Sequence, residues 1–233
     1  MTLPEALRLI VITDLELAKP RSVEEVVEES LQAGARAIQL REKSAAGRIL
    51  LGEARRLRDL TRRWGALLFI NDRCDLALAV EADGVHLGPD DLPVEVVRAV
   101  APEGFLIGAS TDEPEIAKQL EAEGADYIGC GAVFPTATKK DAGEVIGIEG
   151  LARVAAAVKI PVVGIGGVTP EGAHRIAMGS DAVGVAVIGA VMAAANPGEA
   201  TRALLAPFGG LLHPETPDDE DRTFLFQRNT GLF

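Results

Sequence analysis

Short apolar runs alternate with longer amphipathic segments along most of the chain. Each run is rich in Val, Ile and Leu and is apolar nearly throughout, which is typical of strands buried on both faces of a parallel sheet. Eight such strands are predicted, at residues 8–14, 36–42, 67–72, 84–88, 105–111, 127–133, 161–167 and 182–188.

The segments between these runs carry helix signals. Ser22 and Glu25 predict a capping box, Gly34 predicts the end of that helix, and Thr169-Pro170 predicts a cap before a first-turn proline. Small residues with Gly or Asp precede several strands, as tight connections from helix to strand require, at 33–38, 81–86, 123–128 and 178–183. Eight β/α units favour a (β/α)₈ TIM barrel, with an open doubly wound sheet as the alternative.

The length of 233 residues suits one barrel domain, and the last helix is expected to end near Ala206. We therefore predict a catalytic barrel over 1–206 and a tail over 207–233. The tail has Pro and Gly, an acidic run at 218–221 and an apolar end. We expect it to be mobile or to dock against the barrel or a second subunit, so a homo-oligomer is left open.

Net charge and cysteine content indicate which partners and which cellular compartment to expect. The formal net charge of −12 argues against a nucleic-acid partner. Cys74 and Cys130 are far apart and outside any CxxC pair, which indicates reduced, packed thiols and a cytoplasmic protein. The N-terminus has no basic region or cleavage site, and no apolar run reaches about 18 residues, so neither export nor membrane insertion is expected.

Polar residues close the second predicted strand. In a barrel of this kind the active site lies at the C-terminal ends of the strands. Alternation places Gln39, Arg41 and Lys43 on one face, where an amide and two cations suit a phosphate or diphosphate. The alternative is that Arg41 and Lys43 lie in a solvated loop.

Carboxylates follow the third and fourth strands. Asn71 and Asp72 close one strand, and His86, Asp90 and Asp91 belong to the next strand and its loop. Asp72 and Asp91 together suit Mg²⁺, which is often held by one or two carboxylates, waters and substrate phosphate oxygens. The alternative is that both carboxylates cap the following helices. We interpret His86 as a pocket-lining or hydrogen-bonded residue rather than a ligand.

The later strands end in hydroxyl groups, a long loop and glycines. Ser110 or Thr111 could cap the next helix or touch a ligand, and residue type alone favours capping. The loop from 134 to 148 spans about 15 residues, more than ordinary βα loops. Its residues Thr136, Thr138 and Lys139 indicate an anion-binding lid, with a solvated loop as the alternative. The glycines of "GIGGVTP" and "VAVIGAV" would let backbone N–H groups approach a phosphate.

The chain lacks the motifs of nucleophilic and zinc hydrolases. No GxSxG, HExxH or P-loop pattern occurs, and neither cysteine has an evident base partner. The site therefore looks built to bind two anionic groups with Mg²⁺, which is the equipment needed to stabilise a departing diphosphate.

An ordered set of motifs resembles one known family. "ITD", "IQLREK", "FINDRCDLALAVEADGVHLGPDDL", "IGAST", "GAVFPTATKKDA" and "PVVGIGGVTP" occur in order over about residues 6 to 206. This set resembles the thiamine-phosphate synthase family, also called thiamine-phosphate pyrophosphorylase. The family's transferases are (β/α)₈ barrels that join hydroxymethylpyrimidine diphosphate to hydroxyethylthiazole phosphate, giving thiamine phosphate and pyrophosphate.

The resemblance implies a role for each matching residue. The pyrimidine diphosphate would be held by Gln39, Arg41, Lys43, Asn71, Ser110 and Lys139. Mg²⁺ would be held by Asp72 and Asp91, and the thiazole phosphate by Thr136, Thr138, Gly167, Ile188 and Gly189. Arg41, Lys43 and Lys139 would be the electrostatic catalysts, and the loop would close over both substrates.

Two departures and three alternatives remain. Gly189 stands where the family usually has Ser, and the approach to the last strand is one residue longer than usual. The alternatives are a thiazole tautomerase-like isomerase, a non-catalytic phospholigand-binding barrel, and a phosphosugar isomerase or epimerase. The first is disfavoured by the intact Gln-x-Arg-x-Lys, Asn-Asp and Thr-x-Thr-Lys sets, and the last by the lack of an acid–base pair at the strand ends.

Overall fold

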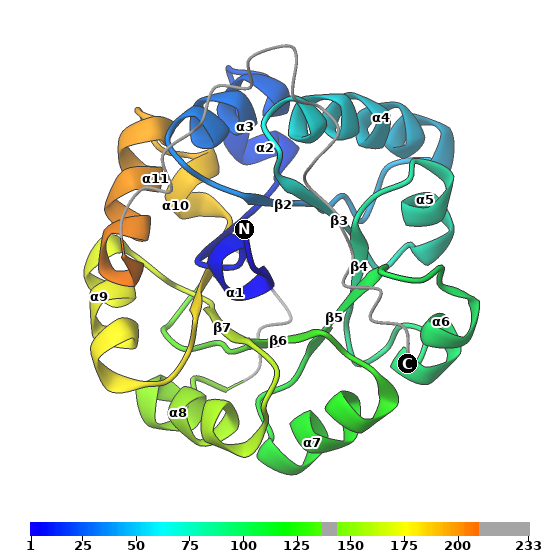
Figure 1. Cartoon of the computed structure of the whole chain (residues 1–233). Helices are drawn as coiled ribbons and strands as arrows, with labels where there is room; N and C mark the ends of the chain where they lie inside the picture. Colours follow the sequence, from blue (N-terminus) through cyan, green and yellow to red (C-terminus); the bar gives the residue numbers. More distant parts are fainter. Residues whose placement is uncertain (137–143, 210–233) are drawn as a thin grey trace.

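A closed barrel of eight parallel strands forms the centre of the computed structural model, which describes residues 1–136 and 144–209 (Figure 1). Neighbouring strands pair in chain order, and β8 pairs with β1. The strands are β1 Leu9–Ile12, β2 Ala37–Leu40, β3 Leu67–Asn71, β4 Gly84–Leu87, β5 Leu106–Ser110, β6 Tyr127–Cys130, β7 Val162–Ile165 and β8 Gly184–Val187. The predicted TIM barrel is confirmed, and the open sheet is excluded because the ring of strands is closed.

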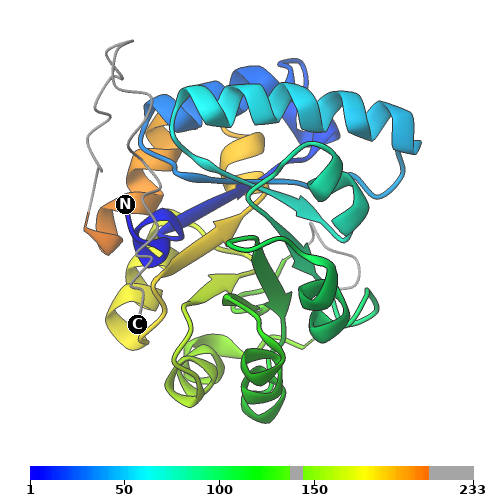
Figure 2. The same ribbon diagram turned by 45° about the vertical axis from the view of Figure 1, so that its right-hand side comes forward.

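Helices surround the strands, all on the outside of the ring except α1, which lies across one end of the barrel (Figures 1 and 2). They are α1 Leu3–Ala6, α2 Leu15–Ala18, α3 Val23–Gln32, α4 Gly47–Arg63, α5 Cys74–Ala79, α6 Val94–Val100, α7 Pro114–Glu123, α8 Gly147–Ala157, α9 Pro170–Gly179, α10 Gly189–Met192 and α11 Pro197–Leu205. The capping box of Ser22 and Glu25 is present, and the Thr169 side chain accepts a hydrogen bond from Gly172 N. Both predicted helix starts are confirmed.

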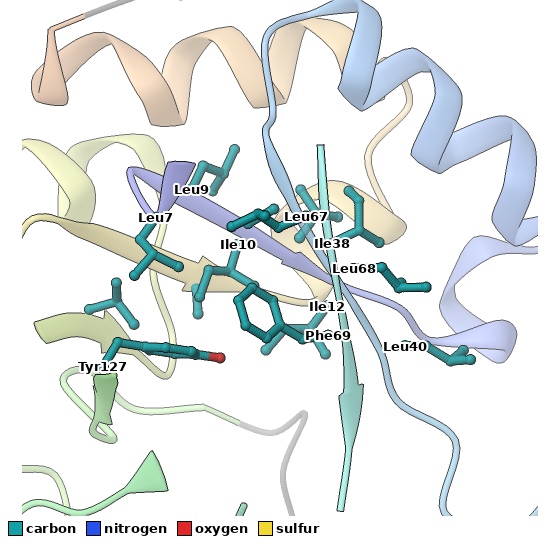
Figure 3. Close-up of a cluster of buried hydrophobic side chains, with 14 of the residues drawn as sticks. Leu7, Leu9, Ile10, Ile12, Ile38, Leu40, Leu67, Leu68, Phe69 and Tyr127 are labelled. Carbon is teal, nitrogen blue, oxygen red and sulfur yellow. The ribbon is translucent and has the colours of Figure 1, made fainter. Parts of the chain in front are cut away.

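Strand alternation divides the apolar side chains between the barrel interior and the layer under the helices. Ile10 and Ile12 line the interior cavity, so the alternate residues Leu9 and Val11 face the helices. Inside the barrel, the rings of Phe69 and Tyr127 meet edge to face with centroids 5.2 Å apart (Figure 3). All these residues are at most 2% exposed, which makes the core continuous across both layers.

An aspartate makes the same kind of hydrogen bonds in two of the predicted helix-to-strand junctions. Asp83, just before β4, accepts hydrogen bonds from Leu68 N of β3 and from Arg58 of α4. Asp126, just before β6, does the same with Ile107 N of β5 and Arg98 of α6. Each aspartate therefore joins its strand to the preceding strand and to an outer helix.

One end of the barrel is closed. The short helix α1 lies across this end in Figure 1, and it precedes β1, so this is the end where the strands begin. Leu7, between α1 and β1, is fully buried. The opposite end, where the strands finish, is left for the functional site.

The described chain ends shortly after the last helix. α11 ends at Leu205 and a 3₁₀ turn covers Ala206–Phe208, as expected for a helix ending near Ala206. The rest of the predicted tail lies outside the described residues, and the division at 206/207 stays a prediction. Within residues 1–136 and 144–209, no helix is both long and apolar enough to cross a membrane.

Candidate active site

A cavity of about 640 Å³ opens at the C-terminal ends of the strands. Its lining includes residues from every strand end or from the loop that follows it. Of the site residues predicted from the sequence, those that line it are Gln39, Arg41, Lys43, Asn71, Asp72, Asp91, Ser110, Thr136, Gly167, Ile188 and Gly189. Thr138 and Lys139 lie outside the described residues, as does the rest of the predicted lid from 137 to 143.

The cationic side of the cavity follows β2. Gln39 is buried within the strand, whereas Arg41 and Lys43 come after its last residue and still border the cavity. The backbone is fixed at this point because Arg41 N donates to Thr13 Oγ1 at 3.0 Å and Thr13 N donates to the Gln39 carbonyl at 2.9 Å. Thr13 is 2% exposed and was not among the predicted site residues. It holds the start of the cationic loop in place.

Asp72 and Asp91 form a carboxylate pair at the cavity wall. Asp91 lies close enough to Asp72 to share a hydrogen bond with it when one of the two is protonated, and Asp91 Oδ2 accepts from Gly88 N at 2.7 Å. Burial, then the hydrogen bond and the repulsion from Asp91, raise the pKa of Asp72 to about 6, and Lys43 and Arg41 partly offset these effects. The pair therefore has two favourable states: it shares a proton, or it binds a cation.

The capping alternative for the two carboxylates is wrong. The residue before α5 is Arg73 and the residue before α6 is Pro93, and neither helix start has a side-chain cap. Asp72 instead has a backbone φ of 62°, an uncommon value for a residue other than glycine. Both carboxylates are thus left for the cavity.

The donor set fits Mg²⁺ better than a transition metal. Hard oxygen ligands suit Mg²⁺, which retains waters and substrate oxygens in its coordination shell. The described residues contain no group of three or more His, Cys, Asp or Glu side chains placed to hold a metal ion. Two carboxylates with open positions are what a metal shared with a phosphate substrate needs.

His86 lies between two hydroxyl groups inside the barrel. Its Nδ1 is 2.9 Å from Tyr127 Oη, and its Nε2 is 2.8 Å from Ser110 Oγ. The interpretation of His86 as a pocket-lining, hydrogen-bonded residue is confirmed. Capping by Ser110 is wrong, since α7 begins after Glu113 without a side-chain cap. Tyr127, the one tyrosine in the chain, was not predicted to border the site.

The glycines after β7 are required by chain packing as well as by the cavity they line. Gly166 has φ 97° and Gly167 has φ 61°, values that favour glycine. The loop after β6 runs against them, because Phe134 N donates to the Gly166 carbonyl at 3.0 Å. A Cβ on Gly166 would lie 2.7 Å from Ala132 Cα. The sequence motif alone suggested only close approach to a ligand.

The two cysteines are buried and unpaired with each other. Burial raises the pKa of both thiols, that of Cys130 to about 12. Reduced, packed thiols were expected, and burial disfavours the thiolate form of both residues.

Comparisons with known proteins agree with one another. A family model described as thiamine monophosphate synthase matches residues 9–191. The thiamine-phosphate synthase of Pyrococcus furiosus is 49% identical over 204 residues, 88% of this chain and 96% of the relative. That of Moorella thermoacetica is 48% identical over 197 residues, 84% of this chain and 93% of the relative. The solved structure of thiamine phosphate pyrophosphorylase from Pyrococcus furiosus gives a TM-score of 0.81 at 47% identity, covering 89% of this chain and 98% of that one.

Proposed function

Since the chain belongs to the thiamine-phosphate synthase family, transferases of thiamine biosynthesis, we propose that its barrel cavity joins hydroxymethylpyrimidine diphosphate to hydroxyethylthiazole phosphate. The products are thiamine phosphate and pyrophosphate. The observation that supports this assignment most is the convergence, in one cavity, of the cationic residues after β2 and the carboxylate pair after β3 and β4.

We assign the diphosphate of the pyrimidine substrate to the side of the cavity next to β2, β3 and β5. Arg41 and Lys43 supply positive charge, while Gln39, Asn71 and Ser110 supply hydrogen-bonding groups on the adjoining strands. Lys139, outside the described residues, belongs to this set by its match to the family motif. Positive charge here stabilises the diphosphate as it departs.

Mg²⁺ is the metal that we assign to Asp72 and Asp91. A raised pKa in a carboxylate pair indicates a site that gains from a cation, and the donor atoms are of the type that Mg²⁺ prefers. When bound, the ion neutralises negative charge on the diphosphate. The two carboxylates hold it beside Arg41 and Lys43, which share that task.

The thiazole phosphate is assigned to the opposite side of the cavity, at Thr136, Thr138, Gly167, Ile188 and Gly189. The described members of this set line the cavity together, from the ends of β6, β7 and β8. Gly189 has no hydroxyl where the family usually has one, so backbone N–H groups carry the interaction there. We expect weaker thiazole phosphate binding than in relatives with serine at this position.

The reaction requires little acid–base chemistry from the protein. The thiazole nitrogen attacks with its lone pair and has no proton to lose, and the electron-rich aminopyrimidine stabilises a developing methylene cation. We therefore propose a dissociative substitution. The protein binds and orients both substrates, neutralises the leaving group, and excludes water from the cation. We also assign the enzyme to the cytoplasm, with these two small molecules as its partners.

The direct test is product formation by the purified chain. Incubation with both substrates and Mg²⁺ should give thiamine phosphate and pyrophosphate in equal amounts, and omission of either substrate should abolish both products. Absence of thiamine phosphate with Mg²⁺ and with Mn²⁺ would rule out this function and favour the non-catalytic phospholigand-binding barrel.

A further inference from the structure

A chain of polar side chains crosses the interior of the barrel, and each of its members lines the cavity. The side-chain amide of Gln39 of β2 lies close enough to the Tyr127 hydroxyl of β6 to lower the pKa of that hydroxyl, against the larger effect of burial. Tyr127 Oη lies 2.9 Å from His86 Nδ1, and His86 Nε2 lies 2.8 Å from Ser110 Oγ. The chain thus links two residues assigned to the pyrimidine diphosphate, Gln39 and Ser110, through two residues without an assigned role.

The strand register makes this chain possible. His86 of β4 pairs with Gly108 of β5, and Gly108 pairs with Tyr127 of β6, so all three are at one level of the barrel. Gly108 has no side chain, and a Cβ there would overlap the Tyr127 ring. His86 and Tyr127 therefore reach each other across β5. One level higher, Ser110 pairs with Gly129, where a Cβ would lie 3.1 Å from His86 Cε1.

Packing holds the middle of the chain rigid. Tyr127 is fully buried, and its ring meets Phe69 edge to face at 5.2 Å and is tilted by 34° against the His86 ring. Figure 3 shows Tyr127 in the interior beside Phe69 and Ile10. Burial raises the pKa of Tyr127 far above its usual range, so its hydroxyl keeps its proton. A neutral hydroxyl has one proton to donate.

The hydrogen bonds from Gln39 to Ser110 can run in two donor-to-acceptor directions, and only one of them suits an anionic substrate. In one direction Ser110 donates to His86 Nε2, which leaves only lone pairs of Ser110 facing an anionic substrate. In the other, Gln39 donates to Tyr127, Tyr127 donates to His86 Nδ1, and His86 Nε2–H donates to Ser110. Only the second direction leaves the Ser110 proton available to an anion.

We propose that Tyr127 and His86 are positioning residues, which fix Gln39 and orient the Ser110 hydroxyl so that it donates to the diphosphate. This inference rests on the proposed function, because that function makes Gln39 and Ser110 ligands of the pyrimidine diphosphate. The relay, meaning Gln39, Tyr127, His86 and Ser110 in this order, holds His86 as the neutral Nε2–H tautomer.

The first experiment measures the tautomer in the unaltered protein. Nitrogen-15 NMR of imidazole-labelled full-length chain, with His86 assigned by loss of its signals in His86→Asn, distinguishes a protonated Nε2 from a protonated Nδ1. The relay predicts Nε2–H at neutral pH. An Nδ1–H tautomer would overturn it. The tautomer is measured in the wild-type protein, whose relay residues are all unaltered.

The second experiment is a double-mutant cycle. Tyr127→Phe removes one hydroxyl and retains the ring, so His86 can adopt the Nδ1–H tautomer and take the Ser110 proton. We expect kcat/KM for the pyrimidine diphosphate to fall about ten- to a hundred-fold. In a Ser110→Ala background the same substitution should cost less than about three-fold, because its effect acts mainly through Ser110.

Controls separate positioning from loss of structure. His174→Asn, at an exposed position on α9, should leave kcat/KM unchanged. The KM for the thiazole phosphate should change little in Tyr127→Phe, since the relay ends at Gln39 and Ser110, which are assigned to the other substrate. Equal losses from Tyr127→Phe with and without the Ser110 hydroxyl would contradict the proposal and indicate a general packing role.

The outcomes also separate this inference from the proposed function. An active wild-type enzyme whose His86 is protonated at Nδ1 overturns the relay alone. A wild-type protein that makes no thiamine phosphate overturns the proposed function and, with it, any role of the relay toward substrate.

Discussion

At the scale of single residues, the carboxylate of Asp72 links the electrostatics of the site to its proposed metal. Its pKa in the folded chain, about 6, lies above its ordinary value of 3.8, chiefly because of burial and the contact with Asp91. The folded chain therefore binds more protons than the unfolded chain between these two pH values. The resulting stabilisation is fully present below the ordinary pKa and is lost as the pH rises through about 6.

This loss predicts the effect of Asp72→Asn on the metal-free protein. The substitution removes the ionisable group, so the variant should keep its free energy of unfolding from pH 5 to pH 8. The wild type should lose about 1 kcal/mol relative to the variant over this range. This value is smaller than the full pKa shift would give, because the carboxylate is partly exposed to solvent. Urea unfolding at both pH values measures this difference. The control Asp75→Asn, at an exposed position, should follow the wild type.

Mg²⁺ should reverse the order of stability of the wild type and Asp72→Asn at pH 8. It binds the folded wild type and not the unfolded chain, so saturating Mg²⁺ should stabilise the wild type at pH 8 and have little effect on Asp72→Asn. Equal stabilisation of both proteins would mean that the ion binds elsewhere.

Thr13 provides a second prediction at this scale. Thr13→Val keeps the shape of the side chain and removes the acceptor for Arg41 N. We expect the KM for the pyrimidine diphosphate to rise about five- to ten-fold, equivalent to about 1 kcal/mol for one lost hydrogen bond, with kcat less affected. Steady-state kinetics test this, and an unchanged KM would show that Arg41 needs no such anchor.

Single residues also show what sequence reasoning could and could not find. Gln39, Asn71 and Asp72 were found because polar residues at the ends of apolar strands stand out and parallel strand ends meet at one edge. Tyr127 and Thr13 were missed because their roles depend on contacts between strands. Ser110 was first interpreted as a helix cap because residue type does not show whether a hydroxyl faces a helix or the barrel interior.

At the scale of elements, the strands were predicted more securely than their ends. The run 36–42 contains β2, but the ladder stops at Leu40, and Arg41 already bonds to a side chain instead of a neighbouring strand. The polar residues that close the predicted strands therefore lie just past the sheet. Alternation continues far enough for Arg41 and Lys43 to reach the cavity from the loop.

Aspartates at similar helix-to-strand junctions are expected to differ in how much they stabilise the fold. Asp83→Ala should destabilise the chain by about 3 kcal/mol, because it leaves Arg58 and Leu68 N without their acceptor in a largely buried setting. Asp181, which precedes β8 in a similar junction, is exposed, and Asp181→Ala should cost less than about 0.5 kcal/mol. Urea unfolding of both variants measures the difference, and similar costs would refute the structural role given to Asp83.

Glycine positions give a prediction for β5. Gly108→Ala should cost about 2 kcal/mol or more, since the new methyl group would overlap the Tyr127 ring. Gly47→Ala, at the start of α4 with open space around it, should be neutral or stabilising by up to about 1 kcal/mol. Thermal and urea unfolding compare the two, and a neutral Gly108→Ala would show that the contact across β5 tolerates displacement.

At the scale of the whole molecule, closure of the barrel creates the site. Residues from all eight strands or the loops after them contribute to one cavity although they span most of the chain. The number of strands and their apolar character predicted this architecture, because parallel strands buried on both faces with helices between them have few other arrangements. Thr138 and Lys139 of the predicted lid lie outside the described residues, so the lid stays a prediction.

The measurement that tests the account most directly is thiamine phosphate formation as a function of Mg²⁺ concentration, in the wild type, Asp72→Asn and the control Asp75→Asn. We predict that the wild type and the control saturate at the same Mg²⁺ concentration, and that Asp72→Asn requires at least about ten-fold more or loses activity, in line with a lost metal ligand. Identical Mg²⁺ dependence in all three proteins, or no product from the wild type, would contradict the account.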